Sequence, residues 1–417
     1  MSDHNYPVSI ELLEHISATE STPVYCYAED AIHERCQSVK KIFKGLPVQW
    51  LFAMKANDNP HILDIFRCER FGFDTVSYEE VLLGLHFVDD PANIFYTENN
   101  MTDAEMNGAI EAGVTLNIGS LTRLEAFCQH PDTRSCSIRI NPNIGDGHHT
   151  KVITGNMDSK FGIRIDLLPD CLALAKKHGV RITGIHAHIG SGIQNPVNFK
   201  TAMEILLRIA ADFPDLEAIN FGGGIPVPYR PEDKEFSLAD FSGLVEPLLK
   251  DDFKNRTRPI TYFFEPGRWL IAQAGILLTR VNTVKDQGNK VFLGTDTGFN
   301  HLLRPALYDA YHHVSNISKP DSKAEKLYDV AGNICESGDI LAFDRKLPET
   351  EIGDLLAFYD AGAYGMTMAS HYNRRALPAE VLIFKDGNTK IIRPRKPASR
   401  QVEELFEETK FKKANVQ

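Results

Sequence analysis

The chain has 417 residues, of which 43% are hydrophobic and 24% charged, a composition typical of a globular protein long enough for two domains. Its 45 basic and 56 acidic residues give a net charge of −11 without a basic block, which disfavours binding to the phosphate backbone of nucleic acids. No apolar run is long enough to span a membrane, and residues 1–16 lack the basic and apolar regions of a secretion signal.

The cysteines are odd in number, scattered, and never spaced as C-x-x-C. This pattern is typical of reduced thiols in a cytoplasmic protein, most of them core fillers. They stand at positions 26, 36, 68, 128, 136, 171 and 335. We expect no special role for the first six. Cys335 differs because a carboxylate, Glu336, follows it directly in "ICESGD" (334–339).

From about residue 45 the sequence alternates apolar runs with amphipathic helical stretches, whose apolar residues recur at three- and four-residue spacing. The apolar runs are 50–55, 71–77, 93–97, 114–119, 137–141, 182–190, 217–224 and 260–267. Eight strands alternating with helices predict an α/β fold, a closed parallel (β/α)8 barrel of the TIM type. We assign this barrel to residues 28–265.

After Glu265 the pattern changes to strand-like runs separated by turn residues, including a hairpin turn at 385–388. The segment "TPVYCY" (22–27) is also strand-like and precedes the barrel. We therefore predict a second, β-rich domain resembling a Greek-key barrel, formed by residues 1–27 and 266–417.

Lys55 ends the first apolar run, "WLFAMK". A lysine at the inner end of a strand is costly unless it is paired or functional, and loss of water lowers the pKa of such an amine and prepares it to form a Schiff base. The alternative is a lysine whose charged head simply reaches solvent. Taken alone, Lys55 favours that alternative.

Two glycine-rich strand ends follow one another, "HAHIGSG" (186–192) and "FGGGIP" (221–226). Exposed backbone N–H groups after successive late strands of a barrel are typical of a phosphate site. His186 and His188 alternate at strand spacing and point the same way, so they are either hydrogen-bonded histidines or a metal-binding pair of the kind that barrel hydrolases use.

Glu265, in "FFEPGR" (263–268), follows two phenylalanines at the end of the last strand. It either pairs with Arg268 as a structural bridge or holds a proton on a heteroaromatic nitrogen. A Schiff-base lysine, a phosphate cradle and an acid for a ring nitrogen together describe a site for pyridoxal phosphate. The combination is far more specific than any one of its parts.

At these residues the sequence resembles the alanine-racemase-like, fold-type III pyridoxal phosphate decarboxylases, and among them those that act on diaminopimelate. The resemblance covers nearly the whole chain, from "TPVYCY" to "IIRPRK". Its motifs, in order, are "FAMKAN", "FDTVSYEE", "RINPNIGDGHHTKVITGNMDSKFGI", "HAHIGSG", "NFGGGIPVPY", "EPGR", "RPALYDAYHH", "CESGD" and "DAGAYG".

The resemblance implies roles around pyridoxal 5'-phosphate. Lys55 would hold the cofactor covalently, His188 would stack on its ring, and Glu265 would pair with the ring nitrogen. Asp74 and Arg139 resemble supporting residues behind it. The phosphate would be surrounded by Ser191, Gly223, Gly224, Gly267, Arg268 and Tyr364.

The resemblance also implies a substrate site and an assembly. Cys335 would donate the proton that replaces the departing carboxylate. The substrate would be bound by Arg268, Arg304, Tyr308, Glu336 and Tyr364. In this family the site forms between two subunits of a homodimer, with the "CESGD" segment reaching the cofactor of the partner chain. We expect a small-molecule substrate and no metal, membrane or nucleic-acid partner.

The implied reaction is decarboxylation of meso-2,6-diaminopimelate to L-lysine and carbon dioxide, the last step of lysine biosynthesis. Arg304 suits a distal carboxylate, and Glu336 suits a distal ammonium. Two alternatives stay open. One is a related decarboxylase for ornithine, D-lysine or a siderophore intermediate. The other is a metal-dependent barrel hydrolase that uses His186 and His188.

Four further histidines are given no catalytic role. His148 and His149 lie in a polar loop that is expected to cover the site. His312 and His313, beside "RPALY", are expected to serve in packing or on the surface.

Overall fold

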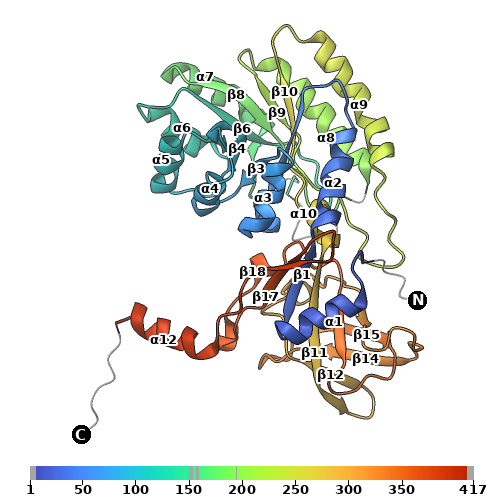
Figure 1. Cartoon of the computed structure of the whole chain (residues 1–417). Coiled ribbons are helices and arrows are strands. Elements are labelled where there is room, and N and C mark those ends of the chain that lie inside the picture. The colour runs from blue at the N-terminus through green and yellow to red at the C-terminus, as the bar shows by residue number, and fades with distance from the viewer. Residues whose placement is uncertain (1–5, 148, 150–153, 156–158, 194, 411–417) are drawn as a thin grey trace. The chain divides into compact units, whose positions relative to one another are not determined.

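The structure, a computed structural model, describes residues 6–147, 149, 154–155, 159–193 and 195–410. The chain forms two bodies, whose elements are labelled in Figure 1. The first is Ile32–Ile271, which we call the barrel. The second, which we call the mixed-sheet body, consists of the described residues before Ile32 and after Ile271. Among the described helices, none has the length and apolarity needed to cross a membrane.

The barrel is built on eight parallel strands in the order β5-β4-β3-β2-β10-β9-β8-β6, and pairing of β5 with β6 closes the ring. They are β2 (Val48–Ala53), β3 (Gly72–Thr75), β4 (Ile94–Thr97), β5 (Thr115–Ile118), β6 (Ser135–Asn141), β8 (Arg181–His186), β9 (Ala218–Asn220) and β10 (Thr261–Phe264). A two-residue strand, β7 (Ile163–Arg164), pairs with the end of β6. All eight apolar runs of the sequence therefore form strands of one barrel, as predicted.

Helices follow the strands and lie outside the ring, as Figure 1 shows for α4 to α7. They are α2 (Glu29–Lys41), α3 (Pro60–Cys68), α4 (Tyr78–Gly84), α5 (Asp103–Ala112), α6 (Leu121–Gln129), α7 (Leu168–His178), α8 (Pro196–Ile209), α9 (Leu238–Asn255) and α10 (Arg268–Ile271). Local sequence sets their ends. Thr102 and Glu105 form a capping box at the start of α5, and Gly113 ends it in the left-handed conformation.

Aromatic side chains pack the outer face of the strands that precede the predicted site. The ring of Phe264 on β10 lies 5.2 Å from that of Trp50 on β2 and 5.3 Å from that of Phe43. Phe199 on α8 and Phe241 on α9 add an edge-to-face pair at 5.1 Å. Buried rings of this size stabilise a core strongly and fix the end of β10, from which Glu265 projects.

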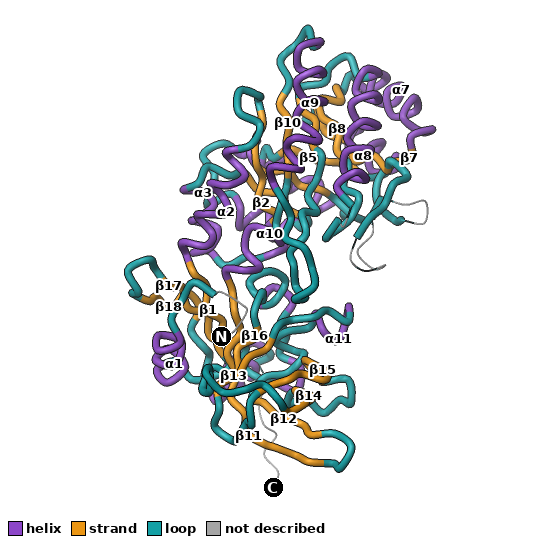
Figure 2. The backbone as a smooth tube through the Cα atoms, turned by 90° about the vertical axis from the view of Figure 1, so that its right-hand side faces the viewer, coloured by secondary structure: helices purple, strands orange, loops and turns teal. Residues whose placement is uncertain are grey.

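The mixed-sheet body is a nine-stranded sheet with parallel and antiparallel pairs (Figure 2). Its strands are β1 (Val24–Ala28), β11 (Gly275–Asp286), β12 (Val291–Thr295), β13 (Val314–Asn316), β14 (Lys326–Ala331), β15 (Ile340–Leu347), β16 (Leu355–Phe358), β17 (Ala379–Ile383) and β18 (Thr389–Arg393). The predicted segment 22–27 supplies β1, which pairs antiparallel with β11 and parallel with β17. The predicted turn at 385–388 joins β17 and β18 as a hairpin.

Three helices belong to the mixed-sheet body: α1 (Ile10–Thr19), α11 (Arg304–Tyr308) and α12 (Ala398–Glu408). The apolar face of α1 buries Leu13 and Ile16 in a cluster with Val24 of β1 and Leu278 of β11. This core secures the centre of the sheet. The residues with predicted chemistry lie instead on α11 and on the loops that follow β14 and β16.

Candidate active site

Lys55 and Asp74 form an ion pair at the carboxyl ends of two neighbouring strands. Lys55 lies in a short 3-10 turn (Met54–Ala56) directly after β2, and Asp74 lies near the end of β3. The Lys55 ammonium contacts Asp74 Oδ2, and the Asp74 side chain is only 1% exposed. Burial raises the pKa of Asp74, the nearby charge of Glu265 adds to this, and Lys55 opposes it. The carboxylate therefore needs the lysine beside it to stay ionised.

Glu265 follows β10 and is held by two side chains, one from the neighbouring strand β9 and one from β8, the next strand beyond it. His186 Nε2, at the end of β8, lies 3.1 Å from Glu265 Oε1, and the Asn220 amide donates to Oε2 at 3.1 Å. Burial alone would raise the pKa of this carboxyl, but His186 and Lys55 more than offset that effect, and the pKa lies well below its usual range. Glu265 is therefore an ionised carboxylate in a water-poor site.

His188 is held as a neutral ring. The backbone N–H of Gly223 donates to His188 Nδ1 at 3.1 Å, so that nitrogen carries no proton. Burial lowers the pKa of His188 to about 3, and the charges of Arg139 and Lys55 act in the same direction. The imidazole is thus neutral across the physiological range. Since one ring nitrogen accepts from the backbone, His188 is not oriented as a metal ligand through that atom.

The glycine-rich ends of β8 and β9 leave room only for backbone. A Cβ on Gly223 would collide with the carbonyl oxygen of Glu265, and one on Gly224 would lie 2.5 Å from the carbonyl oxygen of Gly190. Gly224 also has a φ of +113°, which favours glycine. Side chains hold two N–H groups of this turn, since that of Gly222 donates to Asn220 Oδ1 at 2.9 Å and that of Gly223 donates to His188 Nδ1 at 3.1 Å. The result is a fixed, close-packed glycine turn, which a phosphate can approach closely.

Arg268 completes this cradle at the start of α10. It is 7% exposed and donates to Ser191 Oγ through Nε at 3.2 Å and Nη2 at 3.0 Å. Its Nη1 donates to the hydroxyl of Tyr229 at 3.0 Å. The neighbouring Gly267 is packed tightly against β2, because a Cβ there would lie 3.0 Å from that of Ala53. A buried guanidinium beside a hydroxyl and a glycine turn fits a phosphate group, so the residues present fit pyridoxal phosphate.

Arg139, near the end of β6, is a second buried cation of the barrel. Its guanidinium lies 4.5 Å from the centre of the Phe161 ring. Burial lowers its pKa, while the carboxylates of Glu265, Asp74 and Glu98 oppose that shift. Arg139 therefore offsets part of the negative charge around the strand ends.

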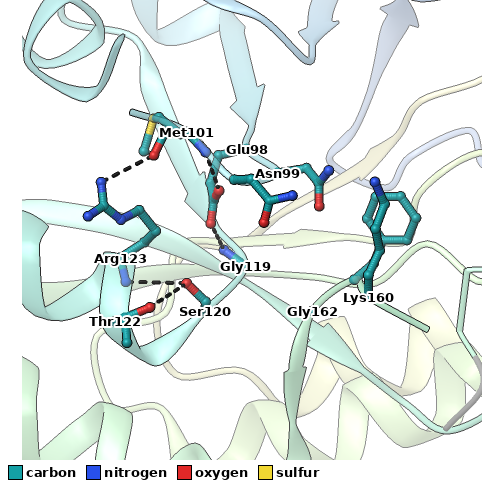
Figure 3. Close-up of a pocket in the computed structure, with 11 residues that line it drawn as sticks. Glu98, Asn99, Met101, Gly119, Ser120, Thr122, Arg123, Lys160 and Gly162 are labelled. Carbon is teal, nitrogen blue, oxygen red and sulfur yellow. Dashed lines mark hydrogen bonds between the residues drawn. The ribbon is translucent and has the colours of Figure 1, made fainter. Parts of the chain in front are cut away.

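A polar pocket of about 190 Å³ lies beside this region, at the ends of β4 and β5 (Figure 3). Glu98, which is buried, accepts hydrogen bonds from the backbone N–H of Gly119 at 2.7 Å and of Met101 at 3.4 Å. Arg123 bonds the Met101 carbonyl at 3.1 Å and the Asp103 carboxylate at 2.6 Å. Arg123 and Asp103 form an ion pair, whereas Glu98 is held by backbone N–H groups, and the sequence patterns did not predict the pocket.

The mixed-sheet body carries Arg304 as the first residue of α11. Its side chain is 1% exposed, and its Nη1 lies 2.8 Å from His312 Nε2. His312 Nδ1 lies 2.8 Å from the carbonyl oxygen of Tyr359, which accepts only if Nδ1 carries the proton. His312 Nε2 is then the acceptor for Arg304. His312, expected to serve in packing or on the surface, is therefore buried and also orients the arginine.

Cys335 and Glu336 stand on the loop between β14 and β15, and both are exposed. The Cys335 backbone N–H donates to Asn373 Oδ1 at 3.1 Å, and the Tyr372 hydroxyl donates to Glu336 Oε1 at 2.5 Å. Tyr364 lies on the loop after β16 with a left-handed φ of +57°. Tyr308 ends α11.

The predicted residues thus fall into two groups, one on each body. The barrel holds Lys55, Asp74, Arg139, His188, Ser191, Gly223, Gly224, Glu265, Gly267 and Arg268 at the carboxyl ends of its strands. The mixed-sheet body holds Arg304, Tyr308, Cys335, Glu336 and Tyr364. The predicted cover loop is only partly described, since His148 lies outside the described residues.

Several contributing residues were missed by the sequence patterns. His186 was expected to be either a hydrogen-bonded histidine or a metal ligand, and the structure shows the first, with Glu265 as the partner that the sequence did not identify. Among the described residues, no group of three or more histidine, cysteine, aspartate or glutamate side chains is placed to hold a metal ion. The other residues that the sequence patterns missed are Asn220, Tyr229, Glu80, Tyr372 and Asn373. Glu80 stands out only in the folded structure, where burial raises its pKa to about 7.

Comparison with known proteins gives one consistent result. Residues 29–272 match the family profile of the pyridoxal-dependent decarboxylases, pyridoxal binding domain. The chain is 41% identical to the diaminopimelate decarboxylase of Methanothermobacter thermautotrophicus, over 91% of this chain and 90% of that one. It is 35% identical to that of Aquifex aeolicus, over 92% and 91%.

Solved structures agree with the sequence comparisons. Diaminopimelate decarboxylase from Helicobacter pylori, complexed with L-lysine, superposes with a TM-score of 0.87 at 32% identity, covering 95% of this chain and all of that one. The site geometry, the family profile and the near-complete coverage lead to the same conclusion. This chain belongs to the diaminopimelate decarboxylase family of pyridoxal-dependent decarboxylases.

Proposed function

We propose that this protein uses pyridoxal 5'-phosphate to decarboxylate meso-2,6-diaminopimelate to L-lysine and carbon dioxide, the last step of lysine biosynthesis. The observation that carries the proposal is Glu265, a buried carboxylate held ionised by His186 in the same strand-end cluster as the Lys55–Asp74 pair. The relatives with the same full-length fold are named for this reaction.

When bound, the cofactor supplies an electron sink for the electron pair left as the carboxylate departs. The barrel residues each have a part in holding it. Lys55 supplies the amine that attaches the cofactor, and the ionised Glu265 keeps a proton on a ring nitrogen. Arg268, Ser191 and the close-packed glycine turn surround the phosphate.

Cys335 is the residue we assign to proton return. Decarboxylation leaves a carbon that must take up a proton, and the thiol of a cysteine carries one at neutral pH. The thiol is exposed on the mixed-sheet body, so solvent can restore its proton after each turnover. Replacing Cys335 with alanine should keep cofactor binding and lower turnover strongly. Full activity of that variant would refute the assignment.

Substrate choice rests on groups that read the end of the molecule away from the reaction. Arg304 suits a distal carboxylate, with Tyr308 and Tyr364 beside it in the proposed site, and Glu336 suits a distal ammonium. Meso-diaminopimelate carries both groups at that end. Ornithine and D-lysine have no distal carboxylate for Arg304 to bind. The presence of both Arg304 and Glu336 therefore favours diaminopimelate.

We further propose a homodimer in which Cys335 and Glu336 of one chain serve the cofactor of its partner. Exposure of both side chains supports this arrangement. Mixing Lys55→Ala and Cys335→Ala chains should restore about a quarter of wild-type activity in a statistically assorted mixture, because about half of the dimers are mixed and each mixed dimer has one intact site of two. No recovery in verified mixed dimers would overturn the sharing of sites. The seven free cysteines also support the cytoplasmic setting that we propose.

Product identification tests the function directly. The purified protein with cofactor should release carbon dioxide from meso-diaminopimelate and form L-lysine in equal amounts. A parallel panel of ornithine, D-lysine and L-lysine serves as the control. Turnover of a panel compound, with none of meso-diaminopimelate, would overturn the proposal in favour of a related decarboxylase.

A further inference from the structure

A short segment of the mixed-sheet body, residues 371–375, lies against the loop that carries Cys335 and Glu336. We call the first the clamp segment and the second, residues 333–339, the thiol loop. Two short strands and several loops separate them in the sequence, and 36 to 42 positions lie between the bonded residues. Neither segment has a regular strand or α-helix to hold it in place.

Three residues of the clamp segment bind three residues of the thiol loop. The Tyr372 hydroxyl donates to Glu336 Oε1 at 2.5 Å, and Asn373 Oδ1 accepts from the Cys335 backbone N–H at 3.1 Å. Arg375 Nη2 donates to the Asn333 carbonyl oxygen at 3.0 Å. The contacts therefore include both residues of the loop to which chemistry is assigned.

The clamp segment has a backbone conformation that few residues adopt. Asn373 and Arg374 have φ values of +53° and +59°, in the left-handed region, which asparagine tolerates better than most residues. Internal bonds keep this shape, with Arg374 N–H donating to the His371 carbonyl at 2.7 Å. This conformation turns the Tyr372 hydroxyl and the Asn373 amide toward the same loop.

A buried carboxylate at the end of the thiol loop, Asp339, braces the loop from within and ties it to Phe299. Asp339 is 3% exposed and accepts from the backbone N–H of Ile334 at 2.7 Å and of Phe299 at 2.6 Å. The Phe299 ring stacks on Tyr372 at 5.8 Å with an interplanar angle of 23°. Phe299 thus contacts Asp339 of the thiol loop and Tyr372 of the clamp segment, and links the two segments.

We propose that Tyr372 and Asn373 are positioning residues for the two reactive groups: Tyr372 orients Glu336 toward the distal ammonium of the substrate, and Asn373 orients Cys335 for proton return. The inference rests on the proposed function. The two neighbouring residues, Tyr372 and Asn373, are expected to affect different steps. Loss of Tyr372 affects binding of ligands with a distal ammonium, whereas loss of Asn373 affects the protonation step.

The geometry explains this separation. An exposed glutamate side chain samples several rotamers, and the hydrogen bond from Tyr372 selects one of them. Glu336 in turn raises the pKa of Tyr372 above its usual value, so the phenol keeps its proton and remains the donor. Asn373 instead accepts from the backbone N–H of Cys335. It therefore fixes the backbone position from which the thiol projects, and not an atom that binds substrate.

Tyr372→Phe tests the first assignment and keeps the ring that stacks on Phe299. The variant should raise the KM for meso-diaminopimelate and the inhibition constant of L-lysine by about 3- to 10-fold, with kcat within about twofold of wild type. L-lysine carries the distal ammonium and carboxylate of the substrate. The comparison ligand, 6-aminohexanoate, lacks that ammonium, and its inhibition constant should be the same in both proteins.

Asn373→Gly tests the second assignment, because glycine accepts the positive φ but removes the acceptor. It should lower kcat about 10-fold, increase the solvent deuterium isotope effect on kcat, and leave the KM and the L-lysine inhibition constant unchanged. Asn373→Asp keeps an oxygen acceptor and tolerates the left-handed conformation. It should recover most of the lost kcat.

The outcomes separate this inference from the proposed function. If the wild-type protein does not act on meso-diaminopimelate, the proposed function fails first. If the wild type is active and both variants match it, the positioning roles are refuted. A uniform loss, in which both variants weaken all ligands and lower kcat alike, also refutes them, because it shows general damage to the loop.

Discussion

The barrel and the mixed-sheet body hold their reactive groups in opposite ways. In the barrel, Glu265, Asp74 and Arg268 are nearly inaccessible to solvent, and each has a partner at the end of another strand of the same barrel. In the mixed-sheet body, Cys335 and Glu336 stand on an exposed loop fixed by other loops. The difference teaches that the barrel groups proposed to hold the cofactor are fixed by the fold itself, whereas the groups proposed for proton return and part of the substrate recognition stand on surface segments.

The free-energy cost of burying a charge explains why the charged side chains of the barrel have partners. A carboxylate without water or a partner takes up a proton, as the raised pKa of Asp74 shows, and Lys55 opposes that change. Glu265 shows the opposite balance, since His186 and Lys55 together outweigh burial. Two carboxylates of one barrel therefore have pKa values shifted in opposite directions. Glu265 therefore remains an anion, whereas the ionisation of Asp74 depends on Lys55.

The largest effect should come from Lys55→Ala, which removes the amine that attaches the cofactor. We expect no measurable turnover and loss of the absorbance of the lysine-bound cofactor. The control is Lys200→Ala on α8, where the lysine pairs only with Glu204 on the surface. The control should match wild type in both measurements. Turnover by Lys55→Ala above the uncatalysed rate would mean that another amine holds the cofactor.

Glu265→Gln should have the next largest effect, because it removes the charge while keeping the shape. We expect kcat to fall by about 100- to 1,000-fold, since a neutral amide does not hold a proton on a ring nitrogen. The absorbance of the bound cofactor should remain, because Lys55 and Arg268 are unchanged. Glu217→Gln, which alters an exposed partner of Arg181, is the control. A kcat above half of the wild-type value would rule out the role of Glu265.

Arg304→Lys should affect binding more than chemistry. Lysine keeps the charge but loses the two parallel hydrogen bonds that a guanidinium makes to a carboxylate. We expect the KM for meso-diaminopimelate to rise by about 10- to 100-fold, with a smaller change in kcat. Thermal unfolding of the variant checks that the buried site tolerates the change. An unchanged KM in a folded variant would contradict the assignment of Arg304 to the substrate.

The smallest effect concerns stability at mildly acidic pH. Burial lowers the pKa of His301 to about 4 from the model-compound value of 6.5. Between these values an unfolded chain takes up a proton that the folded chain excludes, so the free energy of unfolding falls as the pH drops from 7 to 5. His301 should account for about 2 kcal/mol of that fall.

His301→Gln should therefore lose less stability than wild type over the same pH interval, as measured by urea titration at pH 7 and pH 5. Exposed His15 of α1 provides the control, and His15→Gln should keep the wild-type pH dependence. An identical loss in His301→Gln and wild type would show that this histidine titrates normally in the folded protein.

The sequence predicted the barrel well because each strand is buried on both faces and appears as a continuous apolar run. It also predicted where the polar groups of the barrel would gather, since parallel strands end at one edge. It did not predict that His186 pairs with Glu265. These residues lie 79 positions apart, and only the neighbouring order of β8, β9 and β10 brings them together.

The site residues of the mixed-sheet body were harder to predict, because they too depend on contacts between residues that are distant in the sequence. Its exposed loop is supported by Tyr372 and Asn373, which lie in a three-residue 3-10 turn too short to leave a periodic pattern in the sequence. His312 has an ordinary sequence context, and only its contacts with Arg304 and Tyr359 show that it orients a cation. Contacts between loops depend on how the whole sheet packs, and local sequence does not encode them.

The position of β1 has a consequence for how the chain acquires its structure. β1 lies between β11 and β17, and all five of its residues are buried. The barrel occupies one continuous stretch of sequence, whereas both neighbours of β1 are synthesised after that stretch. During translation, β1 waits as an unpaired apolar segment until residues 275–286 and 379–383 have emerged. The barrel is thus the unit able to close first, and the mixed sheet, with the longest sequence separation between its partners, is completed last.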